Sequence, residues 1–158
     1  VYNAIAQSAQ PIFSYNFGQQ NPGRVARTIR LALKTALGCG IFFFAATLVF
    51  NHQIVGLFID KSYQAYDIAV NGIPYFAVGY LFFALNIVGI GYYQSIERAR
   101  RATVITLFRG TLFMLAGFLL LPPVLGVRGI WLAVPLAELL TLLLIIGIYL
   151  KDSFTVRR

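Results

Sequence analysis

Apolar residues fill five long stretches of this chain, and the segments between them gather most of the charged residues. The stretches predict helices at about residues 2–17, 29–50, 68–93, 103–121 and 129–150. Apolar runs of about 20 residues are long enough to cross the hydrocarbon core of a bilayer as helices. We therefore predict an all-α polytopic membrane protein, in which residues 1–158 form one bundle of five transmembrane helices.

The composition agrees with a membrane environment. Hydrophobic residues make up 59% of the 158 residues and charged residues only 11%, whereas a soluble domain carries about 25% charge. The helical pattern is already under way at Val1 and no signal peptide is visible, so we expect an internal or C-terminal part of a longer protein. Cys39 is the single cysteine, which excludes a disulfide framework and a cysteine-based metal site.

Positive charge alternates along the predicted loops. It gathers after the first and third segments and in the tail, at Arg24, Arg27, Arg30, Lys34, Arg98, Arg100, Arg101, Lys151, Arg157 and Arg158. The opposite loops hold only Lys61 and Arg128. Basic loops face the cytoplasm, so we expect a cell-membrane protein with a cytoplasmic C-terminus. The net charge of +8 is then an orientation signal, and no nucleic-acid partner is expected.

The first segment carries a polar stripe. At 100° per residue, its four polar side chains fall within about 60° of one another. They are Asn3, Gln7, Gln10 and Ser14. Polar groups in lipid need partners or water, so the stripe lines a wet substrate cleft or forms hydrogen bonds between helices. Pro11 interrupts the backbone hydrogen bonds of this segment and is expected to kink it.

The third segment carries a second such face, within about 80° on the same helical wheel. Its members are Asn71, Tyr75, Gly79, Phe82, Asn86, Gly89 and Tyr93. Aromatic faces attract cations and other rings, so this surface suits lipophilic cations. The alternative, weighed equally, is a glycine-lined packing groove with tyrosines at the membrane interface.

Two charged residues lie within the later segments. Arg109 is near the start of the fourth segment, and Glu138 is near the middle of the fifth. Charges are costly in lipid and are usually paired or functional. We favour a structural ion pair between them, with a proton-binding role for Glu138 as the alternative. The chain has no Walker loop, HExxH motif or Ser/His/Asp set, and His52 stands alone, so we predict no enzymatic activity.

Three motifs and one arginine resemble the multidrug and toxic compound extrusion (MATE) transporters. QPIFSYNFG at residues 10–18 resembles the family's QP-x-x-SYN-[YF]-G, and YQSIERA at residues 93–99 resembles FQ-x-x-G-[KR]-[AS]. GVRGIWLAVPLAE at residues 126–138 is similar to G-x-x-G-[VI]-W-x-A-x-P-x-[AS]-[DE]. Arg109 stands at the place of an arginine in the helix that follows the second motif. The matches keep the family's order and extend over nearly the whole chain.

The resemblance implies helices 8–12 of a twelve-helix, two-lobe transporter, that is, the C-terminal lobe without its first helix. Such transporters expel aromatic and cationic drugs by alternating access, driven by proton or sodium entry. The implied partners are small organic cations, the lipid bilayer and the N-terminal lobe of the same transporter. The coupling ion, H⁺ or Na⁺, is the only cofactor-like species expected.

The chain departs from the family pattern at two places. Glu97 replaces the usual glycine of the second motif, and Phe83-Ala84-Leu85-Asn86 holds no carboxylate where one branch of the family has an acid. We therefore expect proton coupling through an acid of the N-terminal lobe rather than sodium binding here. Two alternatives stay open: a lipid-linked-oligosaccharide flippase of the same superfamily, and a membrane scaffold subunit that does not transport.

Overall fold

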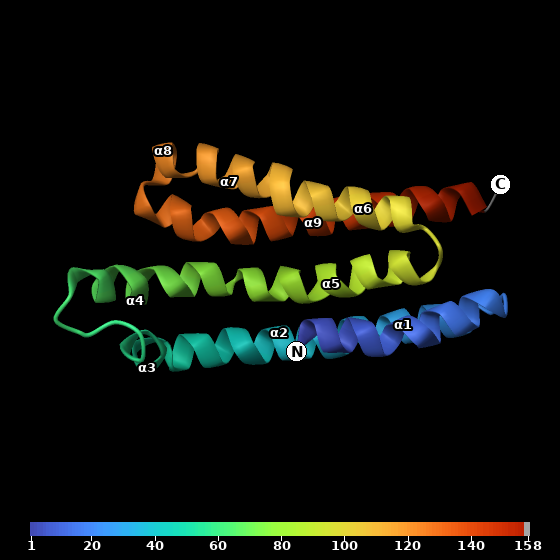
Figure 1. Cartoon of the computed structure of the whole chain (residues 1–158), viewed down its shortest axis with the longest axis horizontal. Coiled ribbons are helices and arrows are strands. Elements are labelled where there is room, and N and C mark those ends of the chain that lie inside the picture. The colour runs from blue at the N-terminus through green and yellow to red at the C-terminus, as the bar shows by residue number, and fades with distance from the viewer. Residues whose placement is uncertain (157–158) are drawn as a thin grey trace.

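The computed structural model describes residues 1–156, with side chains as far as Asp152, and every regular element in that range is helical. The helices are α1 (Tyr2–Gly18), α2 (Pro22–Val49), α3 (Asn51–Gly56), α4 (Gln64–Ala77), α5 (Gly79–Ser95), α6 (Ala99–Leu107), the π-helix η1 (Phe108–Phe113), α7 (Met114–Leu120), α8 (Pro122–Leu125) and α9 (Val127–Val156). Figure 1 shows the long helices running side by side along one direction. The all-helical class predicted from the sequence is confirmed.

The predicted count of five membrane spans is not confirmed. Among the described residues, three helices are long and apolar enough to cross a membrane, at Pro22–Val49, Ala99–Leu125 and Val127–Asp152. The pair α4 and α5 counts as a fourth only if its 42° bend is accepted within one span. Helix α1 has 17 residues, and at 1.5 Å per residue it rises about 26 Å, less than the ~30 Å hydrocarbon core.

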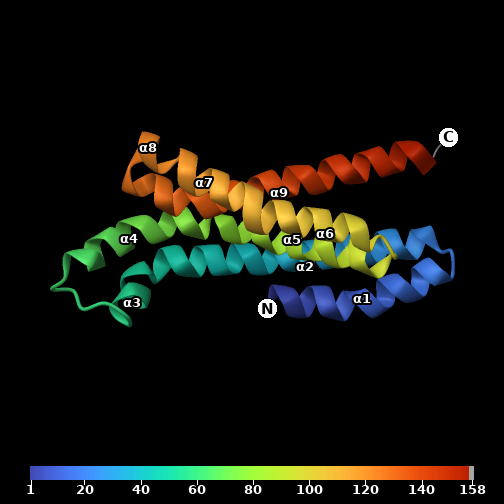
Figure 2. The same cartoon turned by 45° about the horizontal axis from the view of Figure 1, so that its top comes forward.

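The basic residues gather at one end of the bundle. The α1–α2 turn, the α5–α6 turn and the C-terminal part of α9 lie together at the right of Figure 1, and Figure 2 agrees. These places carry Arg24, Arg98 and Lys151, and we call this side the basic end. Arg157 and Arg158 lie outside the described residues. The loops before α4 and α9 lie at the opposite end.

The turns at the basic end follow from local chemistry. Asn21 begins α2 by accepting a hydrogen bond from the backbone N–H of Arg24 at 3.1 Å, and Pro22 occupies the first helical turn. Glu97, between α5 and α6, has a φ of 59°. This left-handed backbone conformation favours glycine, which gives a physical reason for the glycine usual at this position of the motif.

Helix α5 lies between two groups of helices. On one side it packs with α1 and α2 through the small residues Ala9, Ala32, Ala36 and Ala84. On the other side it meets α9, where a Cβ added at Gly89 would contact Ile145 at 3.1 Å. Small residues let helix backbones approach closely in lipid, where association depends on packing rather than on the hydrophobic effect. This arrangement places the middle of α5 inside the bundle.

Candidate functional site

A buried ion pair joins η1 to α9. The Nε of Arg109 donates to both carboxylate oxygens of Glu138 at 3.0 Å, and Nη2 donates to Oε1 at 2.8 Å. The side chain of Glu138 is 4% exposed and that of Arg109 is 18% exposed. Forked arginine–carboxylate geometry of this kind is the strong form of the interaction. The two intramembrane charges singled out in the sequence therefore compensate each other.

Asn86 completes this site from α5. Its Nδ2 donates to the backbone carbonyl of Glu138 and to carboxylate Oε2, both at 2.8 Å. The Asn86 side chain is fully buried, and its Oδ1 has no hydrogen-bond partner among the described residues. We call Asn86, Arg109 and Glu138 the buried polar cluster. It ties α5, η1 and α9 together and gives the carboxylate both a charge partner and a neutral donor.

Two local features position Arg109. Residues 108–113 form a π-helix, a wider turn that shifts the register of the side chains after it and often occurs at functional sites. The guanidinium carbon also lies 4.6 Å from the centre of the Phe83 ring on α5, a favourable cation–π distance. Sequence reasoning missed Phe83, although it stands three residues before Asn86 and so shares its side of a helix.

The polar stripe of α1 is placed differently. Asn3, Gln7 and Ser14 are exposed and Gln10 is half-buried. Near the basic end, Gln10 Nε2 donates to Gln94 Oε1 at 3.2 Å, and Ser14 Oγ donates to the backbone carbonyl of Ser95 at 3.0 Å. Toward the middle of the bundle, neither Asn3 nor Gln7 has a hydrogen bond to any described residue. Two residues of the stripe, Gln10 and Ser14, thus form hydrogen bonds to α5. The other two, Asn3 and Gln7, are exposed at the surface.

The Gln10–Gln94 and Ser14–Ser95 contacts join two of the sequence motifs, since residues 10–18 and 93–99 meet at the basic end. Gln94 and Ser95 were not singled out from the sequence, although both lie in the second motif.

Asp152 was also missed by the sequence analysis. It pairs with Arg98 and Arg101 across the basic end, and it was recognisable as one of few acidic residues in a basic segment. Pro11 is exposed within α1, which continues as one helix through it.

The bend between α4 and α5 divides the face predicted on residues 68–93. Asn86 and Tyr93 are buried, Phe82 is half-buried, and Asn71 and Tyr75 are exposed at the opposite end of the bundle. Gly79 lies 3.5 Å from Pro135 of α9, measured from an added Cβ. The structure thus brings the middle of this face against α9 and leaves its outer part at the surface.

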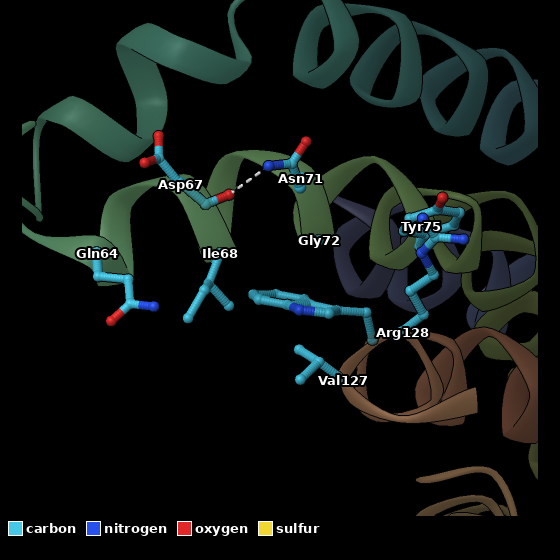
Figure 3. A pocket seen from close by; sticks show the side chains of 9 residues that line it. Gln64, Asp67, Ile68, Asn71, Gly72, Tyr75, Val127 and Arg128 are labelled. Carbon is cyan, nitrogen blue, oxygen red and sulfur yellow. Dashed lines mark hydrogen bonds between the residues drawn. The ribbon is translucent and has the colours of Figure 1, made fainter. Parts of the chain in front are cut away.

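A groove of about 620 Å³ lies beside Asn71 and Tyr75, between α4 and the start of α9. Figure 3 shows Ile68 of α4 and Val127 of α9 pointing toward each other, whereas Asn71 points to the other side of α4, where its amide donates to the backbone carbonyl of Asp67 at 2.8 Å. Gln64, Arg128 and Trp131 also line the groove. The groove is an outer recess, separate from the buried polar cluster.

Outside the predicted spans, one carboxyl has a shifted acidity. In the loop before α4, the backbone N–H and the hydroxyl of Ser62 donate to Asp60 Oδ1 at 2.9 and 2.8 Å. These hydrogen bonds favour the ionised carboxylate and lower the pKa of Asp60 below its ordinary value. Within residues 1–152, no three His, Cys, Asp or Glu side chains lie together as a possible metal site.

Comparison with protein families finds one match, to the family described as MatE, over residues 1–119. The third sequence motif, at residues 126–138, lies beyond the matched range. No curated protein sequence matches the chain significantly.

Two solved structures share the fold. One is an inward-facing conformation of a multidrug resistance MATE family transporter of the MOP superfamily, with a TM-score of 0.82 and 17% identity over 87% of this chain. The other is an outward-facing conformation of such a transporter, with a TM-score of 0.86 and 15% identity over 97% of this chain. This chain covers 32% and 35% of the two structures, respectively, and so spans about a third of their length.

Proposed function

The chain belongs to the MatE family, and we propose that it forms part of a membrane transporter that exports lipophilic, aromatic cations in exchange for an inward-moving cation. The observation that carries the proposal is the family match over residues 1–119. The similarity of its fold to both an inward-facing and an outward-facing transporter supports alternating access by rocking of two lobes. In this proposal the chain supplies helices of the C-terminal lobe, and an N-terminal lobe supplies the other wall of the cleft.

We propose that protons, rather than sodium ions, drive this exchange, through an acid outside these residues. Glu138 is the only carboxylate within the predicted spans, and it is occupied by Arg109 and Asn86. A paired carboxylate needs no further cation for charge balance, and a sodium ion approaching it would meet the guanidinium. The geometry therefore favours the structural role of the pair over a coupling role.

We assign the open half of the α1 stripe to the substrate cleft. Asn3 and Gln7 are exposed and unpaired, and amides in a membrane protein need water, cargo or another polar group. A wet cleft facing the N-terminal lobe provides all three. We also propose that the basic end, with its concentration of arginines, faces the cytoplasm across the cell membrane.

A lipid-linked-oligosaccharide flippase is the second candidate, and the geometry favours it less. Such a protein needs cations that are accessible to a diphosphate within its cleft. Within the predicted spans, Arg30 and Lys34 lie near the basic end, and the remaining cation, Arg109, has its guanidinium already engaged by Glu138. No specific observation favours a scaffold that does not transport.

Accumulation of a fluorescent aromatic cation in cells that express the complete protein tests this function. The proposal predicts less dye in these cells than in cells without the protein, with export abolished by a protonophore and insensitive to sodium removal. Asn3→Leu plus Gln7→Leu should raise accumulation severalfold, whereas Gln19→Leu plus Gln53→Leu, which removes two exposed amides elsewhere, should not. Equal accumulation of every tested dye in all of these cells would contradict the proposal.

A further inference from the structure

Four cations form a stripe along one face of α2 at the basic end. Arg24, Arg27, Arg30 and Lys34 follow one another at intervals of three, three and four residues, and all four are exposed. At 100° per residue they fall within an arc of about 120°. This arc is centred opposite the buried face of α2, which carries Ala32, Ala36 and Gly40. The cations therefore point away from the bundle.

No acidic side chain compensates this α2 stripe. Within residues 1–152, no carboxylate oxygen forms an ion pair with any of its four members, whereas Arg98 and Arg101 share Asp152 at the same end of the bundle. Four unpaired cations on one helix face repel one another. An external anion that binds among them relieves this repulsion.

The length of α2 sets the depth of the stripe in a bilayer. Residues 31–49 contain Lys34 as their only charge and rise about 28 Å, close to the ~30 Å hydrocarbon core. Arg30 then lies at the edge of the core, and Arg27 and Arg24 lie about 4.5 and 9 Å beyond it. Lys34 lies about 6 Å inside, where its long side chain reaches back to the interface. The four cations therefore bracket the phosphate layer.

The same face of α2 continues as an apolar surface. Leu31, 66% exposed, lies among the cations on this face, and Ile41 (52% exposed) and Phe42 (66% exposed) lie deeper in the bilayer on the same face. A free phosphate ion matches the arginines but has nothing to place on this surface. A phospholipid matches both, because its headgroup and acyl chains are joined in the same order along the membrane normal.

We propose that this face of α2 binds an anionic phospholipid of the leaflet at the basic end. The headgroup phosphate lies between Arg27 and Arg30, which offer forked donors suited to phosphate oxygens. Arg24 and Lys34 flank it and favour a net negative lipid over a zwitterionic one. One acyl chain follows Ile41 and Phe42. The proposal concerns lipid binding and holds whether or not the transport function is correct.

Native mass spectrometry of the complete protein, released from nanodiscs of three parts phosphatidylethanolamine to one part phosphatidylglycerol, tests the proposal. We expect retained phosphatidylglycerol in excess over its share of the bilayer. Arg27→Gln plus Arg30→Gln should weaken the retention by about 25-fold, since each juxtamembrane cation contributes about fivefold to the binding of anionic lipid.

Two variants make the result specific. Arg27→Lys plus Arg30→Lys keeps both charges and should keep most of the excess, which attributes the loss in the glutamine variant to the missing charges. Equal melting temperatures of the two variants would show that the glutamine variant is folded. Arg98→Gln plus Arg101→Gln removes the same net charge from the partnered arginines and should change retention by less than half as much. Equal loss in the two glutamine variants, or no excess of phosphatidylglycerol in the unmodified protein, would overturn the proposal and leave another protein segment or a free anion as the occupant.

Discussion

The buried polar cluster and the α1 stripe both place polar side chains within largely apolar helices, yet the fold treats them differently. In the buried polar cluster, Glu138 receives hydrogen bonds from both Arg109 and Asn86. In the α1 stripe, Asn3 and Gln7 are exposed and have no partner among the described residues. The Glu138 carboxylate is therefore satisfied within the chain, whereas Asn3 and Gln7 are open to whatever lies beside α1.

This difference separates stability from function. A polar group that is buried and paired contributes to the fold mainly by avoiding the large cost of being left alone. An exposed, unpaired polar group contributes little to the fold, so its presence in an apolar helix needs another explanation. Substitutions that disturb one region should therefore act on stability, and those in the other should act on transport.

The largest expected effect comes from breaking the ion pair. Arg109→Leu or Glu138→Leu alone leaves a buried unpaired charge and should lower the free energy of unfolding by about 3–5 kcal/mol. The double variant Arg109→Leu plus Glu138→Leu removes both charges and should recover most of that loss. Denaturation of the complete protein in detergent micelles measures all three. Additive losses in the double variant would show that the two residues do not act as a pair.

The next largest effect on stability is expected from the close packing of α7 on α9, which holds η1 near Glu138. A Cβ added at Gly117 would lie 2.8 Å from the carbonyl oxygen of Ala133 and 3.1 Å from its Cα, so the backbones must move apart. Gly117→Ala should cost about 1–3 kcal/mol of unfolding free energy by overpacking.

Gly147→Ala is the matched control for Gly117→Ala, because no atom lies within 4 Å of the added Cβ. It should stabilise α9 by up to about 1 kcal/mol through helix propensity. Thermal melting of both variants measures the contrast. Equal melting temperatures would contradict the close approach of α7 and α9.

Asn86 and Gln7 provide the direct comparison between the two regions. Asn86→Leu removes a buried donor from Glu138 and should cost about 1–3 kcal/mol. Gln7→Leu should change the free energy of unfolding by less than about 0.5 kcal/mol, as for other exposed positions, while reducing dye export. A larger loss of unfolding free energy in Gln7→Leu than in Asn86→Leu would mean that the polar stripe of α1 is packed and that Asn86 is not.

A small stabilising effect is expected at the turn between α5 and α6, which connects the residues that hold α1 to the helix that leads into η1. Glu97 has a φ of 59°, and a non-glycine residue pays about 1–2 kcal/mol for this conformation. Glu97→Gly relieves that strain but gives more freedom to the unfolded chain, so a net gain below about 1 kcal/mol is expected. A loss of thermal stability in this variant would contradict the strained turn.

Much of this arrangement was predictable from the chain. The apolar runs predicted many helix ends to within a few residues, but residues 68–93 belong to two helices and α9 continues six residues beyond 150, to Val156. Helix α2 begins seven residues before the predicted start, at Pro22, because the Asn21 cap extends it through the basic segment. The scarcity of charge within the runs pointed to Arg109 and Glu138, which the fold brings into contact.

Other features depend on tertiary structure. The helical wheel for residues 68–93 assumed one straight helix, and the 42° bend sends Asn71 and Asn86 into different surroundings. A helical wheel also does not show which helix packs against a given face, so it could not distinguish a face packed against α9 from a face that lines a cleft. The π-helix at residues 108–113 and the contact of Asn86 with Glu138 depend on packing that no local pattern encodes.

The buried ion pair of Arg109 and Glu138 has a structural role, in which each charge neutralises the other, and it does not carry the coupling ion. Proton-driven uptake of an aromatic cation into proteoliposomes that contain the Arg109→Leu plus Glu138→Leu variant tests it most directly, with rates normalised to folded protein. An imposed pH gradient should drive uptake at a rate comparable to that of the unmodified protein. A variant that is folded and binds the cation, but no longer responds to the pH gradient, would contradict it.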